Sequence, residues 1–367
     1  MLGIVKDCPE AGILLTGNML RTRVALESAP NRQNRLDVVA RHRATARTGG
    51  PEAALEDKAP DAPCLKQSSG LALGLTDLRR TKGLRGIAKA EAKMRVIYIA
   101  GASHTGSTLL AMMLNAHPEI IAVGELFKLN MKLTAKNAES GAQAPCSCGA
   151  SSLWQCEFWS QVNQHIQSKA NKSLNDLDVQ AYTDFNENSA PNAAVFRAIS
   201  EVSEKKFVVD SSKDLARMSY LLKMWDSNCH PIVIIRDPKG QISSVKNKYG
   251  GFFAHILRYE RVYEQLRRRL GSSPHSVVRY EDLVAAPERT LRSILQPIGL
   301  DFDPLQLNWG EIPNHFVGGN RLRRLRPSNS ELILDERWKH NLTRTQVNVI
   351  DLLTIGSRRF RKGPHRN

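Results

Sequence analysis

The sequence lacks the features that define several classes of protein. Its 367 residues contain no run that approaches the roughly 18 consecutive apolar residues of a membrane-spanning helix, which excludes a membrane span. Six cysteines are too few for a disulfide scaffold in a chain of this length. Aromatic residues make up only 6% of the chain and form no stacking array, which argues against a nucleic-acid partner.

Positive charge is what the sequence has in excess. The net charge is +16, with 16 basic and 10 acidic residues in 1–93 and 36 basic and 26 acidic residues in the remainder. Such a balance favours an anionic partner, and by charge alone nucleic acid, a phosphorylated cofactor and an acidic glycan all fit. Net charge alone does not choose among them.

The character of the chain changes abruptly near residue 94. Residues 1–93 show little amphipathic pattern and are expected to form a poorly ordered extension. Charged residues near the start, including Lys6, Asp7 and Glu10, make a poor signal peptide. We therefore expect one domain over residues 94–360, a basic tail over residues 361–367, and a cytoplasmic location.

Short apolar runs recur from residue 95 onward, and most of them lead into helix-like segments. They cover residues 96–100, 120–123, 207–209, 231–235 and 276–278. Continuous apolar strands that alternate with helices are typical of a parallel sheet buried on both faces. The predicted fold class is α/β, a P-loop-like three-layer domain with a central parallel sheet flanked by helices. In such sheets ligands bind at the carboxyl ends of the strands.

The first strand runs into a glycine-containing loop that resembles a nucleotide-binding loop without its lysine. Gly101, Gly106 and Thr108 match the pattern G-x-x-x-x-G-K-[ST], but Ser107 occupies the lysine position. Backbone amides at a helix N-terminus can still bind an anion, although an ordinary polar turn would have a similar sequence. The pattern predicts phosphate binding, but not ATP.

A second candidate anion site follows the run over residues 231–235. Arg236 lies where that strand ends, and a guanidinium there can grip a phosphate with two hydrogen bonds. Ser244 lies eight residues later, within the first turns of a predicted helix. Together with the glycine loop, this pair indicates a ligand with two separated anionic ends.

These motifs, in this order, resemble those of the sulfotransferases that use 3′-phosphoadenosine-5′-phosphosulfate (PAPS), in particular the bacterial-type and tyrosylprotein-sulfotransferase-like branches. The resemblance covers roughly residues 94–345, and includes a later strand–loop–helix over residues 278–291 and a C-terminal loop over residues 315–323. It implies PAPS as co-substrate, with Arg236 and Ser244 on the 3′-phosphate. The other nucleotide contacts that it implies are Ser103, His104, Thr105, Gly106, Ser107, Thr108, Lys213, Tyr280, Asn320 and Arg323.

The resemblance also implies the catalytic residues. Glu125 matches the family's general base, and a carboxylate just after an apolar run is well placed to accept a hydroxyl proton. Lys213 matches the lysine that contacts the leaving phosphate, where a fixed cation stabilises growing negative charge. A structural salt bridge for Glu125 and an exposed loop position for Lys213 are the alternatives.

His104 is the departure from the family pattern, because most relatives carry Lys or Arg at that position. A neutral histidine donates one hydrogen bond and supplies positive charge only when protonated. Either its catalytic role persists with a dependence on pH, or Lys213 supplies the charge alone.

The sequence leaves the acceptor and the cysteines open. The implied acceptor is a hydroxyl on a glycan, a peptide tyrosine or a small molecule, and the transfer needs no metal. Cys146, Cys148 and Cys156 could bind zinc with His165 as the fourth ligand, form a disulfide, or stay reduced. Two rival interpretations remain. One is a P-loop kinase or NTPase that uses Asp210 or Asp237 to bind magnesium. The other is a non-catalytic, degenerate relative.

Overall fold

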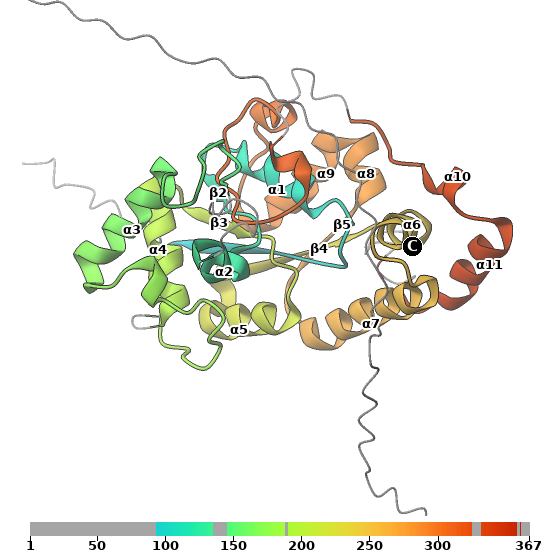
Figure 1. Ribbon diagram of the computed structural model, residues 1–367, viewed down its shortest axis with the longest axis horizontal. Helices are drawn as coiled ribbons and strands as arrows, with labels where there is room; N and C mark the ends of the chain where they lie inside the picture. Colours follow the sequence, from blue (N-terminus) through green and yellow to red (C-terminus); the bar gives the residue numbers. More distant parts are fainter. Residues whose placement is uncertain (1–92, 135–144, 188–189, 325–331, 358–359, 361–367) are drawn as a thin grey trace, which may run out of the picture. The chain divides into compact units, whose positions relative to one another are not determined.

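A computed structural model describes residues 93–134, 145–187, 190–324, 332–357 and 360, shown in colour in Figure 1. The extension predicted over residues 1–93 lies outside the described residues up to residue 92, and the predicted tail over residues 361–367 does so entirely. No helix in the described ranges is long and apolar enough to cross a membrane. The cytoplasmic location stays a prediction.

Five parallel strands form one sheet, as the apolar runs predict. The strand order is β2-β3-β1-β4-β5, with β1 in the centre. Their bounds are β1 Arg95–Ala100, β2 Ile120–Ala122, β3 Phe207–Asp210, β4 Cys229–Ile235 and β5 Ser276–Arg279. Because all strands run the same way, the residues that follow β1, β2, β3 and β4 meet at one edge of the sheet.

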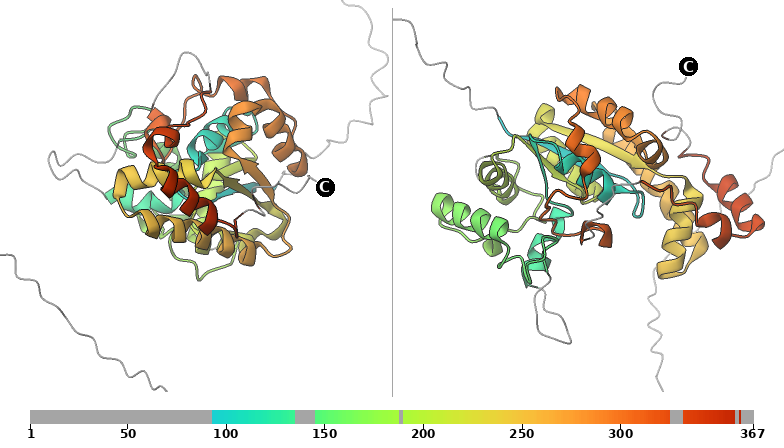
Figure 2. Two further views of the ribbon diagram at one scale, coloured as in Figure 1. Left: turned by 90° about the vertical axis from the view of Figure 1, so that its right-hand side faces the viewer. Right: turned by 90° about the horizontal axis from the view of Figure 1, so that it is seen from above.

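Helices cover both faces of the sheet and complete three layers (Figures 1 and 2). One face packs against α1, α8 and α9, and the other against α4, α5 and α7. The bounds are α1 Ser107–Asn115, α2 Leu129–Thr134, α3 Glu157–Ala170, α4 Pro191–Ser203, α5 Leu215–Trp225, α6 Pro238–Tyr249, α7 Phe252–Leu270, α8 Tyr280–Ala285, α9 Pro287–Leu295, α10 Trp338–Asn341 and α11 Arg344–Leu353. The predicted α/β class is confirmed.

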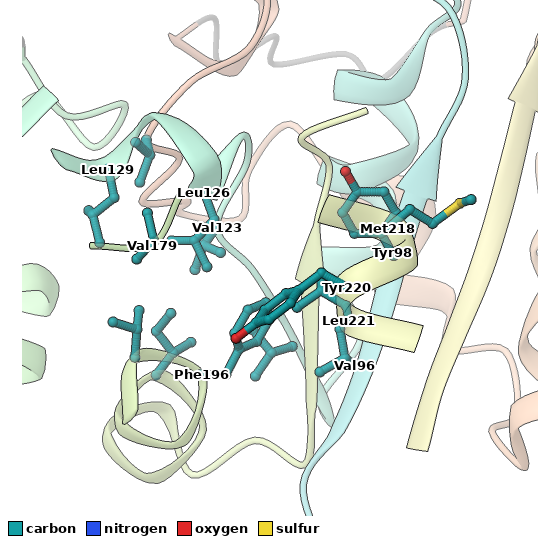
Figure 3. Close-up of a cluster of buried hydrophobic side chains, with 14 of the residues drawn as sticks. Val96, Tyr98, Val123, Leu126, Leu129, Val179, Phe196, Met218, Tyr220 and Leu221 are labelled. Atoms are coloured by element: carbon teal, nitrogen blue, oxygen red, sulfur yellow. The ribbon is translucent and has the colours of Figure 1, made fainter. Parts of the chain in front are cut away.

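The alternation of side chains along β1 divides the core into two clusters. Val96 and Tyr98 point into the cluster beneath α4 and α5, whereas Ile97 and Ile99 point into the cluster beneath α1. Figure 3 shows the first cluster, in which Leu126 belongs to the turn that follows Glu125. The backbone of this part of the site is therefore anchored by buried apolar side chains.

Candidate active site

The loop between β1 and α1 has a shape that only its glycines permit. Gly101 has φ of 151°, and a Cβ there would lie 2.4 Å from the carbonyl oxygen of Ile234. Gly106 has φ of 91°, and a Cβ would lie 2.5 Å from the ring of Tyr280. The loop thus packs closely between β4 and Tyr280 and delivers the N-terminus of α1 to the edge of the sheet. Amide groups at such an N-terminus favour an anion.

The side chains of this loop have defined neighbours. The Thr105 hydroxyl donates to the carbonyl of Ala102 at 2.8 Å, which closes the turn internally. The Ser103 carbonyl accepts a hydrogen bond from Gln241 in α6 at 2.8 Å. Ser107 and Thr108 are buried in the first turn of α1, and the Thr108 hydroxyl accepts from the Asn320 amide at 3.1 Å.

Glu125 and Lys213 form an ion pair just beyond β2 and β3. The Lys213 Nζ atom lies 2.7 Å from one carboxylate oxygen of Glu125, and Lys128 pairs with the other oxygen. Burial by itself would raise the pKa of Glu125, but the attraction of Lys213 and Lys128 outweighs it and holds the pKa below its usual range. The carboxylate is therefore ionised near pH 7. We call Glu125, Lys128 and Lys213 the transfer end of the site.

A buried ion pair lies beneath the transfer end. The Arg217 Nε atom in α5 donates to Asp210 at 2.6 Å, and both side chains are fully buried. Asp210 also accepts from the Ser212 side chain and backbone amide, and the Ser212 hydroxyl accepts from the Phe127 amide at 3.1 Å. This network ties the backbone beside Glu125 to the backbone beside Lys213, so it fixes the distance between the two charged groups.

The second anion-binding pair of the sequence also comes together, with two additional partners. His104 Nδ1 lies 2.9 Å from the Ser244 hydroxyl, and Arg236 donates to the His104 carbonyl at 3.2 Å. The Arg236 guanidinium stacks over the Tyr280 ring at 4.6 Å and pairs with the Asp335 carboxylate at 3.1 Å. We call His104, Arg236, Ser244 and Asp335 the anchor end.

The His104 ring is thus directed to Ser244 at the anchor end. Burial lowers the pKa of His104, and the nearby cations Lys248, Arg236 and Lys213 lower it further. The ring is therefore neutral near pH 7, and the cations that pair with Glu125 are Lys213 and Lys128. His104 and Lys213 also share an uncommon backbone conformation, with φ of 63° and 61°. Such strain of about 1–3 kcal/mol per residue is found where the surrounding structure holds a functional group in place.

The loop over residues 314–323 closes the site from the C-terminal part of the chain. The Val317 amide donates to the Val123 carbonyl at 2.9 Å, and Asn320 contacts Thr108 as described. Gly318 lies so close to Glu125 that a Cβ would be 3.1 Å from the carboxylate oxygen Oε2. Arg323 donates to the Asn320 carbonyl at 3.0 Å. The residues that the sequence proposes for the site therefore lie on the β1 loop, at the transfer end, at the anchor end or on this loop, except Tyr280, which begins α8 and packs against Arg236 and Gly106.

Several contacts were not foreseen from the sequence. Lys128 is three residues from Glu125, a spacing that could have signalled the pairing. Asp335 is 99 residues from Arg236, and no local pattern links them. Arg217 lies in α5, and nothing in the local sequence marks it as buried. Its ion pair with Asp210 could therefore not be predicted. Among the alternatives for the cysteines, His165 does not serve as a fourth ligand, because it pairs with Glu201 at 2.7 Å and His315 approaches the cysteines instead.

A five-stranded parallel sheet with flanking helices, and with a glycine loop between its first strand and the next helix, defines the P-loop-like α/β class. The pattern of the Sulfotransferase family matches residues 96–304, more than half of the chain. The chain therefore belongs to the Sulfotransferase family.

Individual relatives are more distant. Protein-tyrosine sulfotransferase 2 of Gallus gallus is 23% identical over 254 residues, which are 66% of this chain and 60% of that protein. The sulfotransferase domain of the Synechococcus PCC 7002 olefin synthase is 17% identical, with a TM-score of 0.39 over 72% of this chain and 96% of that one. Sulfotransferase STF9 of Mycobacterium avium is 11% identical, with a TM-score of 0.42 over 74% of this chain and 78% of that one.

Proposed function

We propose that this protein transfers the sulfuryl group of PAPS to an acceptor hydroxyl, with Glu125 as the general base. The observation that carries the proposal is the Glu125–Lys213 pair, 2.7 Å apart, at the same sheet edge as the loop from β1. A base and a cation are the two groups that such a transfer needs, one for the proton and one for the leaving charge.

PAPS, when bound, supplies an activated sulfuryl group joined to the 5′-phosphate. The acceptor oxygen forms a bond to sulfur as its proton passes to the Glu125 carboxylate. The bond between sulfur and the bridging oxygen breaks, and its electron pair remains on the 5′-phosphate of adenosine 3′,5′-bisphosphate. The Lys213 ammonium stabilises that negative charge, so the residue works without a proton transfer of its own. No step in this scheme requires a metal.

The nucleotide is assigned to the remaining residues. Backbone amides and hydroxyls of residues 103–108 would hold the phosphosulfate, and Arg236 with Ser244 would hold the 3′-phosphate. The fit is supported by Asp335, since a carboxylate of the chain already occupies an anion position on Arg236 at 3.1 Å. It is also supported by Arg323, whose buried Nε atom has no hydrogen-bond partner among the described residues. Tyr280, Asn320 and Arg323 complete the nucleotide site in this proposal.

The acceptor carries a hydroxyl on a glycan, a peptide tyrosine or a small molecule. Burial lowers the pKa of Lys132, and the positive charges of nearby Arg323, Lys128 and Arg324 lower it further. Several cations therefore lie together on this side of Glu125. A basic surrounding favours an acceptor with negative charge close to its hydroxyl. Because one relative is a protein-tyrosine sulfotransferase, acidic peptides that contain tyrosine are the first acceptors to test.

A magnesium-dependent kinase or NTPase is less well supported. Asp210 is fully buried and paired with Arg217, so it is not available to a metal on a nucleotide. Asp237 begins α6, where its side chain accepts from the Lys239 amide at 2.8 Å. Neither carboxylate that such an enzyme would need is placed for the task.

Calorimetry on the full chain tests the proposal. Adenosine 3′,5′-bisphosphate should bind with micromolar affinity, whereas ATP with magnesium should bind at least about tenfold more weakly. Transfer of radioactive sulfur from labelled PAPS to an acidic tyrosine peptide or a glycan then tests the reaction. Preferential binding of ATP would support a kinase, and binding of neither nucleotide would indicate a degenerate, non-catalytic relative.

A further inference from the structure

Three cysteines and one histidine from three segments meet beside the site. Cys146 and Cys148 lie in the loop that precedes α3, Cys156 caps the N-terminus of α3, and His315 lies in the loop that closes the site. Their sulfur and nitrogen atoms all lie within 4.8 Å of one another. The Cys148 and Cys156 sulfurs are 3.7 Å apart, and Cys156 Sγ is 3.2 Å from His315 Nδ1.

The separations of 3.7 Å and 3.2 Å are close to those of a tetrahedral metal site and too long for a disulfide. Two sulfurs in a disulfide are about 2.05 Å apart, and all four described cysteines are free. Sulfurs that share a tetrahedral Zn²⁺ at bond lengths of about 2.3 Å lie about 3.8 Å apart, and a sulfur and a histidine nitrogen lie about 3.5 Å apart. Three thiolates and one imidazole also form one of the closed ligand sets typical of structural zinc.

The segments that carry the four residues are oriented by further contacts. The Ser147 hydroxyl donates to the Asn314 carbonyl at 2.9 Å and accepts from the Phe316 amide at 2.7 Å. The Trp159 indole donates to the His315 carbonyl at 2.9 Å, and the His315 ring stacks on Phe158 at 4.9 Å. Contacts of this kind fix the orientation of metal ligands before the metal arrives.

We propose that Cys146, Cys148, Cys156 and His315 bind one Zn²⁺ in a closed, structural site. Binding replaces the thiol protons, which pass to solvent, with three sulfur–zinc bonds and one nitrogen–zinc bond. No ligand position remains for a substrate, so the ion takes no part in the transfer chemistry. Of the three alternatives that the sequence leaves open for the cysteines, this proposal takes zinc binding, with His315 in place of His165 as the fourth ligand.

The zinc acts on the active site through the loop over residues 314–323, which contains His315. Two residues after His315, the Val317 amide bonds to Val123, and the Asn320 amide then reaches Thr108 in α1. Between these contacts, Gly318 lies against Glu125. The metal therefore fastens the loop over residues 314–323, which lies against the transfer end, to the loop that precedes α3. His315 and the three cysteines are positioning residues.

Metal analysis of the full chain, purified without chelator, tests the proposal. We expect close to one zinc per chain. His315→Ala and Cys148→Ser should each lower the content to below about 0.2, whereas the matched control His165→Ala should retain it. A content below about 0.1 in the unaltered chain, or zinc lost from His165→Ala and kept in His315→Ala, would overturn the proposal.

Two further measurements keep the test decisive if a ligand variant does not fold. The unaltered protein loaded with Co²⁺ should show the visible bands of tetrahedral cobalt and the charge-transfer band of thiolate ligands, and their absence would contradict the site. Removal of zinc by a chelator should speed hydrogen exchange at the Val317 and Asn320 amides at least about tenfold. Unchanged exchange would disprove the effect on the loop. Neither readout depends on PAPS or on turnover, so failure here and failure of the proposed function are distinguishable.

Discussion

The transfer end and the anchor end of the site are held in different ways. At the transfer end, the Glu125–Lys213 pair rests on Asp210 and Arg217, which are fully buried and bonded at 2.6 Å. At the anchor end, Arg236 is paired with Asp335, whose side chain is 21% exposed. The first arrangement is complete without a ligand, whereas the second uses a carboxylate of the chain where a ligand anion would bind. Under the proposed function, the reacting groups would be preorganised and the carboxylate on Arg236 would be exchanged for the ligand anion on binding.

The largest expected effect comes from the base itself. Glu125→Gln should lower turnover by about 10²- to 10⁴-fold, because the amide cannot accept the acceptor's proton. Affinity for adenosine 3′,5′-bisphosphate should change little, as measured by calorimetry. Glu288→Gln on α9 removes an exposed carboxylate and serves as the control, with turnover unchanged. Full activity of Glu125→Gln would remove Glu125 from the mechanism.

Loss of the buried support should be nearly as severe. Arg217→Met leaves Asp210 as a buried charge without its partner, which should lower the free energy of unfolding by about 3–5 kcal/mol in urea denaturation. Arg267→Met removes an exposed partner of Glu264 on α7 and should leave stability unchanged. Equal stability of the two variants would mean that the transfer end does not depend on its buried network.

A substitution at the anchor end should change the affinity for the bisphosphate and leave the free energy of unfolding unchanged. Arg236→Lys keeps the charge but loses the paired donors, so affinity for the bisphosphate should fall roughly 10- to 100-fold. Arg261→Lys, at an exposed position of α7, is the matched control and should bind normally. Unchanged affinity of Arg236→Lys would contradict its assignment to the 3′-phosphate.

If the ligand displaces the Asp335 carboxylate from Arg236, one substitution should increase the affinity for the bisphosphate. Asp335→Asn removes the carboxylate that competes for Arg236, so bisphosphate affinity should rise roughly 2- to 10-fold. The neighbouring Glu336→Gln, which removes a charge paired with Lys339, should have no such effect. Weaker binding by Asp335→Asn would show that the carboxylate supports the nucleotide site and does not occupy it.

The smallest expected effect is a dependence on pH that separates the two ends. The pKa of His104 is lowered, mainly by burial and then by Lys248 and Arg236. The ring therefore becomes positively charged only at a pH below the usual pKa of histidine. Acidification should therefore strengthen bisphosphate binding severalfold. His104→Gln should lack this component, and its profile subtracts the titration of the ligand's own phosphates. Identical profiles for the two proteins would exclude His104 from the anchor end.

Much of the fold was predictable because it follows from local patterns. The five apolar runs correspond to the five strands, since a parallel sheet buried on both faces requires continuous apolar sequence. The glycine loop was predictable for a similar reason, because two positive φ angles demand particular residues at fixed spacing.

The site was predictable only in part, because several of its contacts join distant segments. The resemblance to a family brought Glu125 and Lys213 together across 88 residues, which no periodicity could do. Pairings that no motif specifies, such as Asp335 with Arg236 and His315 with Cys156, depend on how late segments fold back over the sheet. His165 was one possible ligand because it is near the cysteines in the sequence, yet its ring is directed from α3 to Glu201 in the neighbouring α4.

The central position of β1 has a consequence for synthesis of the protein. Both neighbours of this strand, β3 and β4, come more than a hundred residues later in the chain. At translation rates of about 5–20 residues per second, the apolar run that forms β1 waits several seconds on the ribosome for its partners. During that interval it resembles an unprotected, aggregation-prone segment, and the glycine loop has no β4 to pack against. Nascent chains that stop before residue 235 lack the complete β4, so they should bind chaperones through β1, the central strand of the folded sheet.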